Sequence, residues 1–370
     1  MTLFDGITAR LIDTPRLSVN ILERAGDDPQ TPPDRTVVFI HGNGSSSLFW
    51  QEIMQDLPHD LRAIAIDLRG YGGTEHAPID ATRGVRDFSD DVYETLQALG
   101  IPSAHLVGWS MGGGVVMQYA LDHPALSLTL QSPVSPYGFG GTRRDGSRLT
   151  DDDAGAGGGA ANPDFVQRLI DHDTSDEAPT SPRNVFRSGY VAPGYTTEHE
   201  DVWVESILST STATGNYPGD SVDSENWPGF GAGTVGVLNT MAPKHFNVSG
   251  IVDLDPKPPI LWIHGVADAI VSDASFYDYN HLGALGIVPD WPGEEVAPAQ
   301  QMVSQTRDVL EEYAARGGEY REIALDDVGH SAHLERPAEF RHALLQVIGY
   351  VGHPSEPSPP TEAIILRSAD

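Results

Sequence analysis

Ser110 is the residue whose surroundings most clearly suggest chemistry. It lies in a Gly-Trp-Ser-Met-Gly pattern over residues 108–112, after the apolar run 105–107 and before a run of small residues. Glycines two residues before and after a serine allow a sharp turn from a strand into a helix, which exposes the hydroxyl beside helix N–H groups. We therefore predict a strand, a turn and a helix here, with Ser110 as a nucleophile.

A serine hydroxyl needs a base within reach and a further group that orients the base. Asp268 and His330 each follow a predicted strand later in the chain, so the order is serine, aspartate, histidine. That order is typical of a nucleophilic serine on a wound α/β sheet. We predict His330 as the base and Asp268 as its orienting acid, with Asp273 as the spare acid and His333 as the competing histidine.

When a nucleophile attacks a carbonyl carbon, the carbonyl oxygen becomes negatively charged and needs N–H groups that donate hydrogen bonds to it. Met111, the residue after Ser110, can supply one from the start of the helix. The run His41-Gly42-Asn43-Gly44 follows another apolar segment and can supply the second, from the backbone of Asn43 or alternatively of Gly44. His41 itself is interpreted as a structural loop residue.

Apolar runs alternate with segments of helical periodicity around these residues. A continuous apolar run at 36–40 is expected for a strand buried on both faces of a parallel sheet, and further strands are predicted at 62–67, 105–107, 126–134, 259–264 and 320–325. Helical segments are predicted at 46–57, 85–99, 112–121, 298–315 and 338–350, with Asp90 and Asp91 on the outer face of the second. Segments 9–12 and 17–22 predict an opening hairpin. The pattern indicates a doubly wound, mostly parallel α/β fold.

The alternation stops at residue 135 and resumes near 259, which is too long for a bare loop. We predict a mainly helical cap inserted at 135–250, with helices at 164–170 and 198–208, covering Ser110. The core halves are then 1–134 and 251–351, and residues 352–370 form a surface tail. Within the cap, the glycine-rich run 155–159 predicts a mobile connector and the acidic run 151–153 a solvated loop.

Composition excludes several classes of partner. The chain of 370 residues carries 22 basic and 53 acidic side chains, a formal net charge of −31. The negative electrostatic field of this charge repels nucleic acids and anionic membrane surfaces, so neither is an expected partner. The absence of cysteine excludes disulfides, thiolate nucleophiles and cysteine-bound metals. Without a signal-peptide pattern or an apolar stretch of membrane length, we expect a cytoplasmic protein.

The run Gly231-Ala232-Gly233-Thr234-Val235-Gly236 matches a dinucleotide-binding fingerprint letter by letter. A Trp-Pro-Gly-Phe segment precedes it where the fingerprint requires a strand, so we interpret it as a cap loop. The histidines and carboxylates show no convincing metal-ligand spacing. No cofactor and no metal are therefore expected.

Together these motifs resemble the α/β-hydrolase superfamily, in its capped serine hydrolase branch with an HGxG oxyanion loop and a GxSxG elbow. Similar segments also occur at 67–72 (DLRGYG), at 265–268 (GVAD) and at 329–337 (GH with Glu335 and Pro337). The resemblance implies Ser110 as nucleophile, His330 as base, Asp268 as its orienter, and Asn43 and Met111 as oxyanion donors. Serine rather than aspartate at the elbow disfavours the haloalkane dehalogenase and epoxide hydrolase branches.

We therefore predict a serine esterase or lactonase that cleaves a small, apolar substrate through an acyl-enzyme. Phe49, Trp50, Trp109 and Trp227 are candidate pocket residues, and ordinary core packing explains each of them equally well. Three alternatives stay open: a carbon–carbon bond hydrolase or cofactor-free perhydrolase with the same triad, a ligand receptor on a hydrolase fold, and a nucleotide-binding protein.

Overall fold

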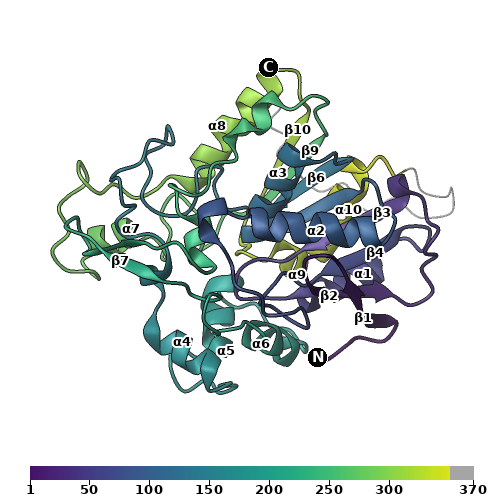
Figure 1. The fold of residues 1–370 in the computed structure, drawn as a ribbon, viewed down its shortest axis with the longest axis horizontal. Helices are drawn as coiled ribbons and strands as arrows, with labels where there is room; N and C mark the ends of the chain where they lie inside the picture. Colours follow the sequence, from purple (N-terminus) through teal and green to yellow (C-terminus); the bar gives the residue numbers. More distant parts are fainter. Residues whose placement is uncertain (351–370) are drawn as a thin grey trace.

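The computed structural model describes residues 1–350 and contains an eight-stranded central sheet (Figure 1). The strands, in the order in which they lie side by side, are β1 (Ile7–Asp13), β2 (Ser18–Arg24), β4 (Arg62–Ile66), β3 (Thr36–Ile40), β5 (His105–Trp109), β6 (Ser127–Gln131), β9 (Ile260–Gly265) and β10 (Tyr320–Leu325). β2 pairs antiparallel with β1 and with β4, and every other neighbouring pair is parallel. The predicted hairpin and mostly parallel sheet are confirmed. The predicted tail at 352–370 lies outside the described residues.

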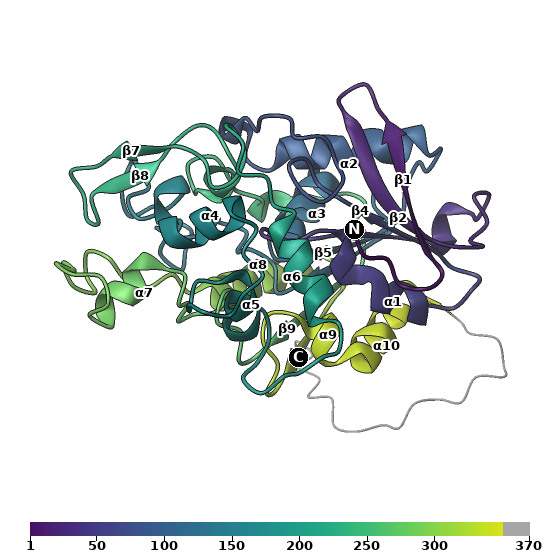
Figure 2. The same ribbon diagram turned by 90° about the horizontal axis from the view of Figure 1, so that it is seen from below.

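Helices cover both faces of this sheet (Figure 2). α2 (Arg86–Ala98) and α3 (Met111–Asp122) lie on one face, and α1 (Gln51–Asp56) and α10 (Pro337–Val347) lie on the other. Every residue of β3, β4, β5 and β6 is buried, which for β3 confirms the strand covered on both faces that the apolar run at 36–40 predicts. α8 (Met302–Ala315) packs beside β10, and the short α9 (Ala332–Glu335) precedes α10. The core helices are therefore present where their periodicity predicts them, with ends shifted by a few residues.

Residues 132–259, between β6 and β9, are called the insertion below. Its α4 (Pro163–Ile170) and α6 (Glu200–Leu208) correspond to the two predicted helices. Periodicity did not predict α5 (Pro182–Val185), the π-helical turn Phe186–Tyr190 that continues it, or the hairpin of β7 (Ser221–Asp223) and β8 (Phe230–Ala232). The cap boundaries at 135 and 250 stay a prediction.

The acidic run 151–153 is not a solvated loop throughout, so that prediction was wrong. Asp153 is fully buried, with 0% of its surface exposed. Its carboxylate pairs with the Arg148 guanidinium at 2.8 Å and accepts a hydrogen bond from the Lys244 backbone N–H at 2.6 Å. A buried carboxylate is stable only with such partners, and the sequence alone did not identify them.

The glycine-rich run 155–159 is packed rather than a mobile connector, which corrects a second prediction. The Gly158 N–H donates to the Asn239 side-chain oxygen at 3.0 Å. A Cβ atom at Gly157 would lie 2.8 Å from the Cα of Ala232, closer than real contacts allow. Glycine serves here to let two backbone segments approach each other.

Residues 266–301 form a second excursion, between β9 and α8, that the sequence analysis did not predict. Its helix α7 (Tyr279–Ala284) lies at the same end of the molecule as the β7–β8 hairpin in both views (Figures 1 and 2). The Tyr279 and Phe230 rings are 5.0 Å apart, and the Trp227 indole N–H donates to the Pro289 carbonyl at 2.8 Å. The insertion and the second excursion therefore pack against each other.

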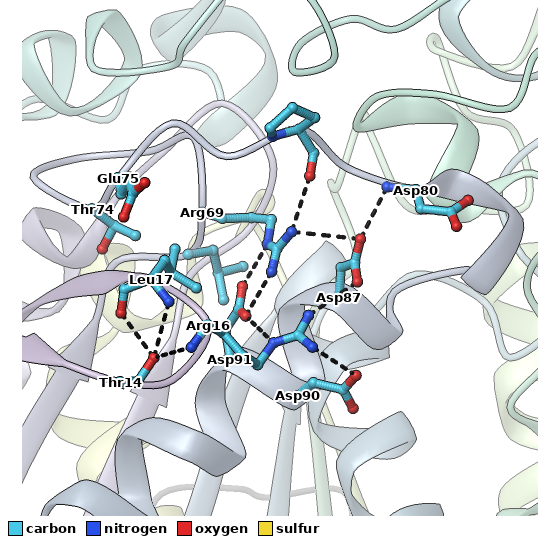
Figure 3. A network of polar contacts seen from close by, with 12 residues as sticks. Thr14, Arg16, Leu17, Arg69, Thr74, Glu75, Asp80, Asp87, Asp90 and Asp91 are labelled. Atoms are coloured by element: carbon cyan, nitrogen blue, oxygen red, sulfur yellow. Dashed lines mark hydrogen bonds and ion pairs between the residues drawn. The ribbon is translucent and has the colours of Figure 1, made fainter.

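A network of arginine–aspartate pairs joins the loop after β4 to α2 (Figure 3). Arg69 donates to the two carboxylate oxygens of Asp91 at 2.5 and 2.7 Å, and Arg16 donates to Asp91 at 2.6 Å. The prediction that Asp91 points outward was wrong, because these two guanidinium groups satisfy its charge and leave it 2% exposed. Asp90 is half-buried and pairs with Arg83 at 2.6 Å.

Candidate functional site

Ser110 lies at the junction of β5 and α3 with φ 58° and ψ −121°, a backbone conformation that residues other than glycine rarely adopt. Its N–H donates to the Gln131 carbonyl at 3.0 Å, so the end of β6 supports the turn. A Cβ atom at Gly112 would lie 2.4 Å from the His41 carbonyl oxygen. The glycine at 112 is thus required for the helix to start this close to the 41–44 loop.

His330 and Asp268 form a buried pair on the loops that follow β10 and β9. His330 Nδ1 and Asp268 Oδ2 are 2.7 Å apart, and the side chains are 2% and 1% exposed. The other Asp268 oxygen accepts hydrogen bonds from the N–H groups of Ile270 at 2.8 Å and Val271 at 3.0 Å. The carboxylate is therefore fixed, and it engages Nδ1 of the imidazole while leaving Nε2 to other partners.

Trp109 links the Ser110 turn to the His330 loop. Its indole N–H donates to the His330 carbonyl at 2.9 Å, and the two rings are 5.5 Å apart. Within residues 1–350 the Ser110 hydroxyl makes no hydrogen bond, so the structure joins His330 to Asp268 but not to Ser110. Catalytic hydrogen bonds are often long in enzymes without substrate and shorten only in the reacting complex.

The two competing residues, Asp273 and His333, are engaged elsewhere. Asp273 accepts hydrogen bonds from the N–H groups of Val303 at 2.9 Å and Ser304 at 3.0 Å, at the start of α8. His333 is fully buried, with Nδ1 2.8 Å from the Gln131 amide nitrogen. Burial lowers the pKa of His333 to about 3 and keeps the ring neutral. Both side chains have structural partners.

The backbone N–H groups of Asn43 and Met111 make no hydrogen bond within the part of the chain that the structure describes. Met111 is the first residue of α3, where N–H groups lack a partner inside the helix. The peptide that carries the Asn43 N–H lies against the serine turn, because a Cβ atom at Gly42 would be 2.8 Å from the Cβ of Ser110. Both N–H groups therefore lack a protein acceptor among the described residues, and their role as oxyanion donors stays a prediction.

The orientation of the Asn43 N–H is set by bonds to the other end of the same peptide. The Gly42 carbonyl accepts from His41 Nδ1 at 2.7 Å and from the Ser45 hydroxyl at 2.8 Å. His41 Nε2 accepts from the Leu68 N–H at 3.0 Å, so Nδ1 carries the proton, and burial lowers the pKa of this ring. A trans peptide points its C=O and N–H in opposite directions, so these bonds turn the Asn43 N–H away from His41. His41 is the structural loop residue that the sequence predicted.

Two tyrosines that the sequence analysis missed also hold the 41–44 loop. The Tyr71 hydroxyl donates to the Asn43 side-chain oxygen at 2.8 Å, and the Tyr190 hydroxyl donates to the Gly44 carbonyl at 2.8 Å and the Asn43 carbonyl at 3.1 Å. Burial raises the pKa of both phenols well above the ordinary value, so they stay protonated donors. Tyr71 lies in the 67–72 motif and could have been considered, whereas Tyr190 lies in a segment without any periodic signal.

The candidate pocket residues separate into two groups. Phe49, Trp50 and Trp109 are at most 1% exposed and belong to one aromatic cluster, in which the Phe49 ring lies 4.9 Å from Trp109 and 5.1 Å from Trp203. Trp227 lies in the insertion, and among the described residues no ring contact joins it to the other three. A role in substrate binding stays a prediction for all four.

The glycine pattern at 231–236 lacks the geometry of a dinucleotide site. Gly231 and Ala232 lie on β8 of the small hairpin, and the 3₁₀ turn Leu238–Met241 follows in place of a long helix. The fingerprint needs a helix N-terminus that faces a pyrophosphate. In residues 1–350, no three histidine or carboxylate side chains are grouped to hold a metal ion. Over the same range, each helix is too short or too polar to span a membrane.

Curated proteins align with only part of this chain. A fluoroacetate dehalogenase from Burkholderia sp is 30% identical over 131 residues, which are 35% of this chain and 41% of the dehalogenase. The monoacylglycerol lipase abhd6-A from Xenopus laevis is 31% identical over 107 residues, which are 26% of this chain and 30% of the lipase. These alignments span less than half the length of either relative.

Solved structures match over nearly the whole chain. The esterase EaEST from Exiguobacterium antarcticum has a TM-score of 0.57 at 16% identity, covering 92% of this chain and 100% of that chain. A 2-hydroxy-6-oxo-6-phenylhexa-2,4-dienoate hydrolase from Rhodococcus sp. has a TM-score of 0.56 at 19% identity, covering 93% and 99%. At such identities the likeness shows the fold alone. A family model described as alpha/beta hydrolase fold matches residues 35–337, and the chain therefore belongs to that family.

Proposed function

We propose that this protein is a capped serine hydrolase that cleaves a small, apolar carboxylic ester or lactone through an acyl-enzyme. The proposal is carried by the buried His330–Asp268 pair, 2.7 Å apart, together with Ser110 on a turn of φ 58° that the neighbouring Trp109 ties to His330. A serine turn and a fixed histidine on loops that the Trp109–His330 hydrogen bond connects are suited to acyl transfer.

In the first half of the reaction, Ser110 Oγ attacks the substrate carbonyl carbon while His330 Nε2 takes the hydroxyl proton. Asp268, hydrogen-bonded to Nδ1, holds the tautomer and stabilises the imidazolium that forms. The carbonyl oxygen becomes negative and is stabilised by the N–H groups of Asn43 and Met111. When the tetrahedral intermediate collapses, the C–O bond breaks and His330 gives its proton to the departing alkoxide.

In the second half, a water molecule attacks the acyl-enzyme carbonyl while His330 accepts the proton of the water. The same N–H groups of Asn43 and Met111 stabilise the second oxyanion. Collapse releases the carboxylic acid and returns the proton to Ser110 Oγ. The balance needs only substrate and water, so no redox partner or group donor enters the cycle.

The relatives support a hydrolase activity, but their names differ in the substrate. Their names include a dehalogenase and a lipase, and the solved structures include esterases and a dienoate hydrolase. Serine at position 110 favours an acyl-enzyme over the dehalogenase branch, in which the resemblance places aspartate at the elbow. The acidic surface, with a net charge of −31, disfavours highly anionic substrates.

The proposal is tested with a panel of short and medium acyl esters, lactones and amides on the wild type and Ser110→Ala. We expect turnover of at least one ester or lactone series, and a loss of about 10⁴-fold or more in kcat/KM for Ser110→Ala. Circular dichroism on both proteins shows whether they are equally folded.

Other results of the panel would indicate a different reaction or a binding protein. Turnover restricted to vinylogous diketones, or to peracid formation, would replace ester cleavage by another reaction of the same triad. Tight binding of a panel member that survives Ser110→Ala, without turnover by either protein, would indicate a receptor and contradict the proposal.

A further inference from the structure

The insertion supplies one side chain to the loop that carries the proposed oxyanion donor. Tyr190 closes the π-helical turn Phe186–Tyr190, and its single hydroxyl proton is shared between the Gly44 carbonyl at 2.8 Å and the Asn43 carbonyl at 3.1 Å. Gly44 has φ +62°, and a Cβ atom there would lie 2.6 Å from the Tyr190 oxygen. The glycine therefore makes the space that the hydroxyl fills.

The Tyr190 ring is held by packing, so its hydroxyl has a defined position. The residue is 6% exposed, and its ring centre lies 5.7 Å from Trp109, 5.9 Å from Phe49 and 6.3 Å from His330. A tyrosine packed on three rings keeps little rotamer freedom. π-helical turns are rare and occur often at functional sites, which agrees with a specific placement of this residue.

Two residues further on, the same segment contacts the histidine loop. The Ala192 N–H donates to Glu335 Oε2 at 2.8 Å, and the Gly329 N–H donates to the two Glu335 oxygens at 2.9 and 3.1 Å. A Cβ atom at Gly329 would be 2.6 Å from the Ala192 nitrogen. Residues 190–192 thus lie between the 41–44 loop and the His330 loop and touch both.

We propose that Tyr190 is a positioning residue for the oxyanion donor, and that the insertion controls catalysis through this hydroxyl. The inference rests on the proposed function. His41 and Ser45 fix the carbonyl on the Gly42 side of the Asn43 N–H, and Tyr190 fixes the carbonyls that follow it. Because the carbonyls before and after it are fixed, the Asn43 N–H keeps one orientation, toward the substrate oxygen that becomes negative only during the reaction.

The position of the hydroxyl bond predicts which kinetic constant changes. The Tyr190 hydroxyl is bonded to backbone carbonyls, so its loss leaves ground-state contacts with a substrate in place. A donor that serves the transition state only affects kcat and leaves KM nearly constant. Displacement of a catalytic group by a fraction of an ångström is enough for a measurable loss of rate.

The test compares Tyr190→Phe with the wild type on the best ester found for the wild type. Phenylalanine keeps the ring and its packing and removes only the hydroxyl. We expect kcat to fall about tenfold, with KM within about twofold of the wild-type value. The concentration of competent sites is measured by titration with a fluorophosphonate, which separates lost folding from slower chemistry.

Tyr313→Phe is the matched control. Tyr313 lies on α8, is fully buried, and donates its hydroxyl to the Pro258 carbonyl at 2.5 Å. Tyr313→Phe therefore loses a hydroxyl-to-carbonyl hydrogen bond like that of Tyr190, but outside the proposed site. We expect this variant to have a lower melting temperature and an unchanged kcat per titrated site.

The outcomes separate this inference from the function on which it rests. If the wild type is active and Tyr190→Phe has the kcat of Tyr313→Phe, the positioning role is overturned and the hydrolase proposal stands. A rise in KM without a fall in kcat would also overturn it, since that result indicates substrate binding. If the wild type turns over no member of the panel, the proposed function and this inference fail together.

Discussion

The carboxyl ends of the central strands and the insertion hold their polar groups in different ways. At the strand ends, Asp268, His330 and Ser110 follow the last residues of β9, β10 and β5 within a few positions. In the insertion, the buried carboxylate of Asp153 has partners in its own region, Arg148 at 2.8 Å and the Lys244 N–H at 2.6 Å. The strand ends bring together groups from distant parts of the chain, whereas Asp153 is satisfied by partners within the insertion.

The two carboxylates differ in whether an oxygen is left for a catalytic partner. Asp153 has its carboxylate oxygens engaged by a guanidinium and a backbone N–H of the insertion. Asp268 uses one oxygen for backbone N–H groups and offers the other to the single imidazole of His330. We therefore expect substitutions at the strand ends to change turnover, and substitutions inside the insertion to change stability, with Tyr190 as the exception.

The largest effect in this comparison is expected for Asp268→Asn. An amide can keep the shape of the carboxylate but cannot stabilise an imidazolium and permits the wrong histidine tautomer. We expect kcat to fall about 10³- to 10⁴-fold, with little change in KM. Steady-state kinetics with the best ester measures this loss. The control is Asp273→Asn, which changes the acidic residue at the start of α8 and should retain turnover. Equal losses of kcat for the two variants would contradict Asp268 as the residue that orients His330.

A smaller effect, on stability alone, is expected for Asp153→Ala. The change leaves the Lys244 N–H without its acceptor and Arg148 without its partner, at a cost of about 2–3 kcal/mol in the free energy of unfolding. Urea denaturation followed by circular dichroism measures the loss. Asp153→Asn keeps an acceptor and tolerates the local φ of 52°, so it should lose less. A fall in kcat for folded Asp153→Ala would contradict the separation of the two regions.

The sheet and the serine turn could be predicted because their signals are local. Strands such as Thr36–Ile40 are buried on both faces and are apolar after Thr36, and the glycines at 108 and 112 are needed by the turn itself. The order of Asp268 and His330 after their strands also placed them at one edge of the sheet. Their 2.7 Å contact follows from the parallel pairing of β9 and β10.

The insertion could not be predicted to the same extent because its structure depends on contacts between distant residues. Asn239 binds the Gly158 and Gly233 N–H groups through one oxygen, and nothing at position 239 indicates those partners in the sequence. Asp91 has the spacing of an outward-facing helix residue, and Arg16 and Arg69 bury it from elsewhere in the chain. Tyr190 is likewise a single residue in an irregular segment, with no spacing to identify it.

The central claim is that Ser110 is a nucleophile activated by His330. It is tested most directly by treating the folded protein with a fluorophosphonate, digesting it, and locating the added mass by tandem mass spectrometry. We predict one adduct, on Ser110, formed at least about 10²-fold more slowly in folded His330→Ala. Folded wild type that acquires no adduct, or that carries it on another residue, would contradict the claim.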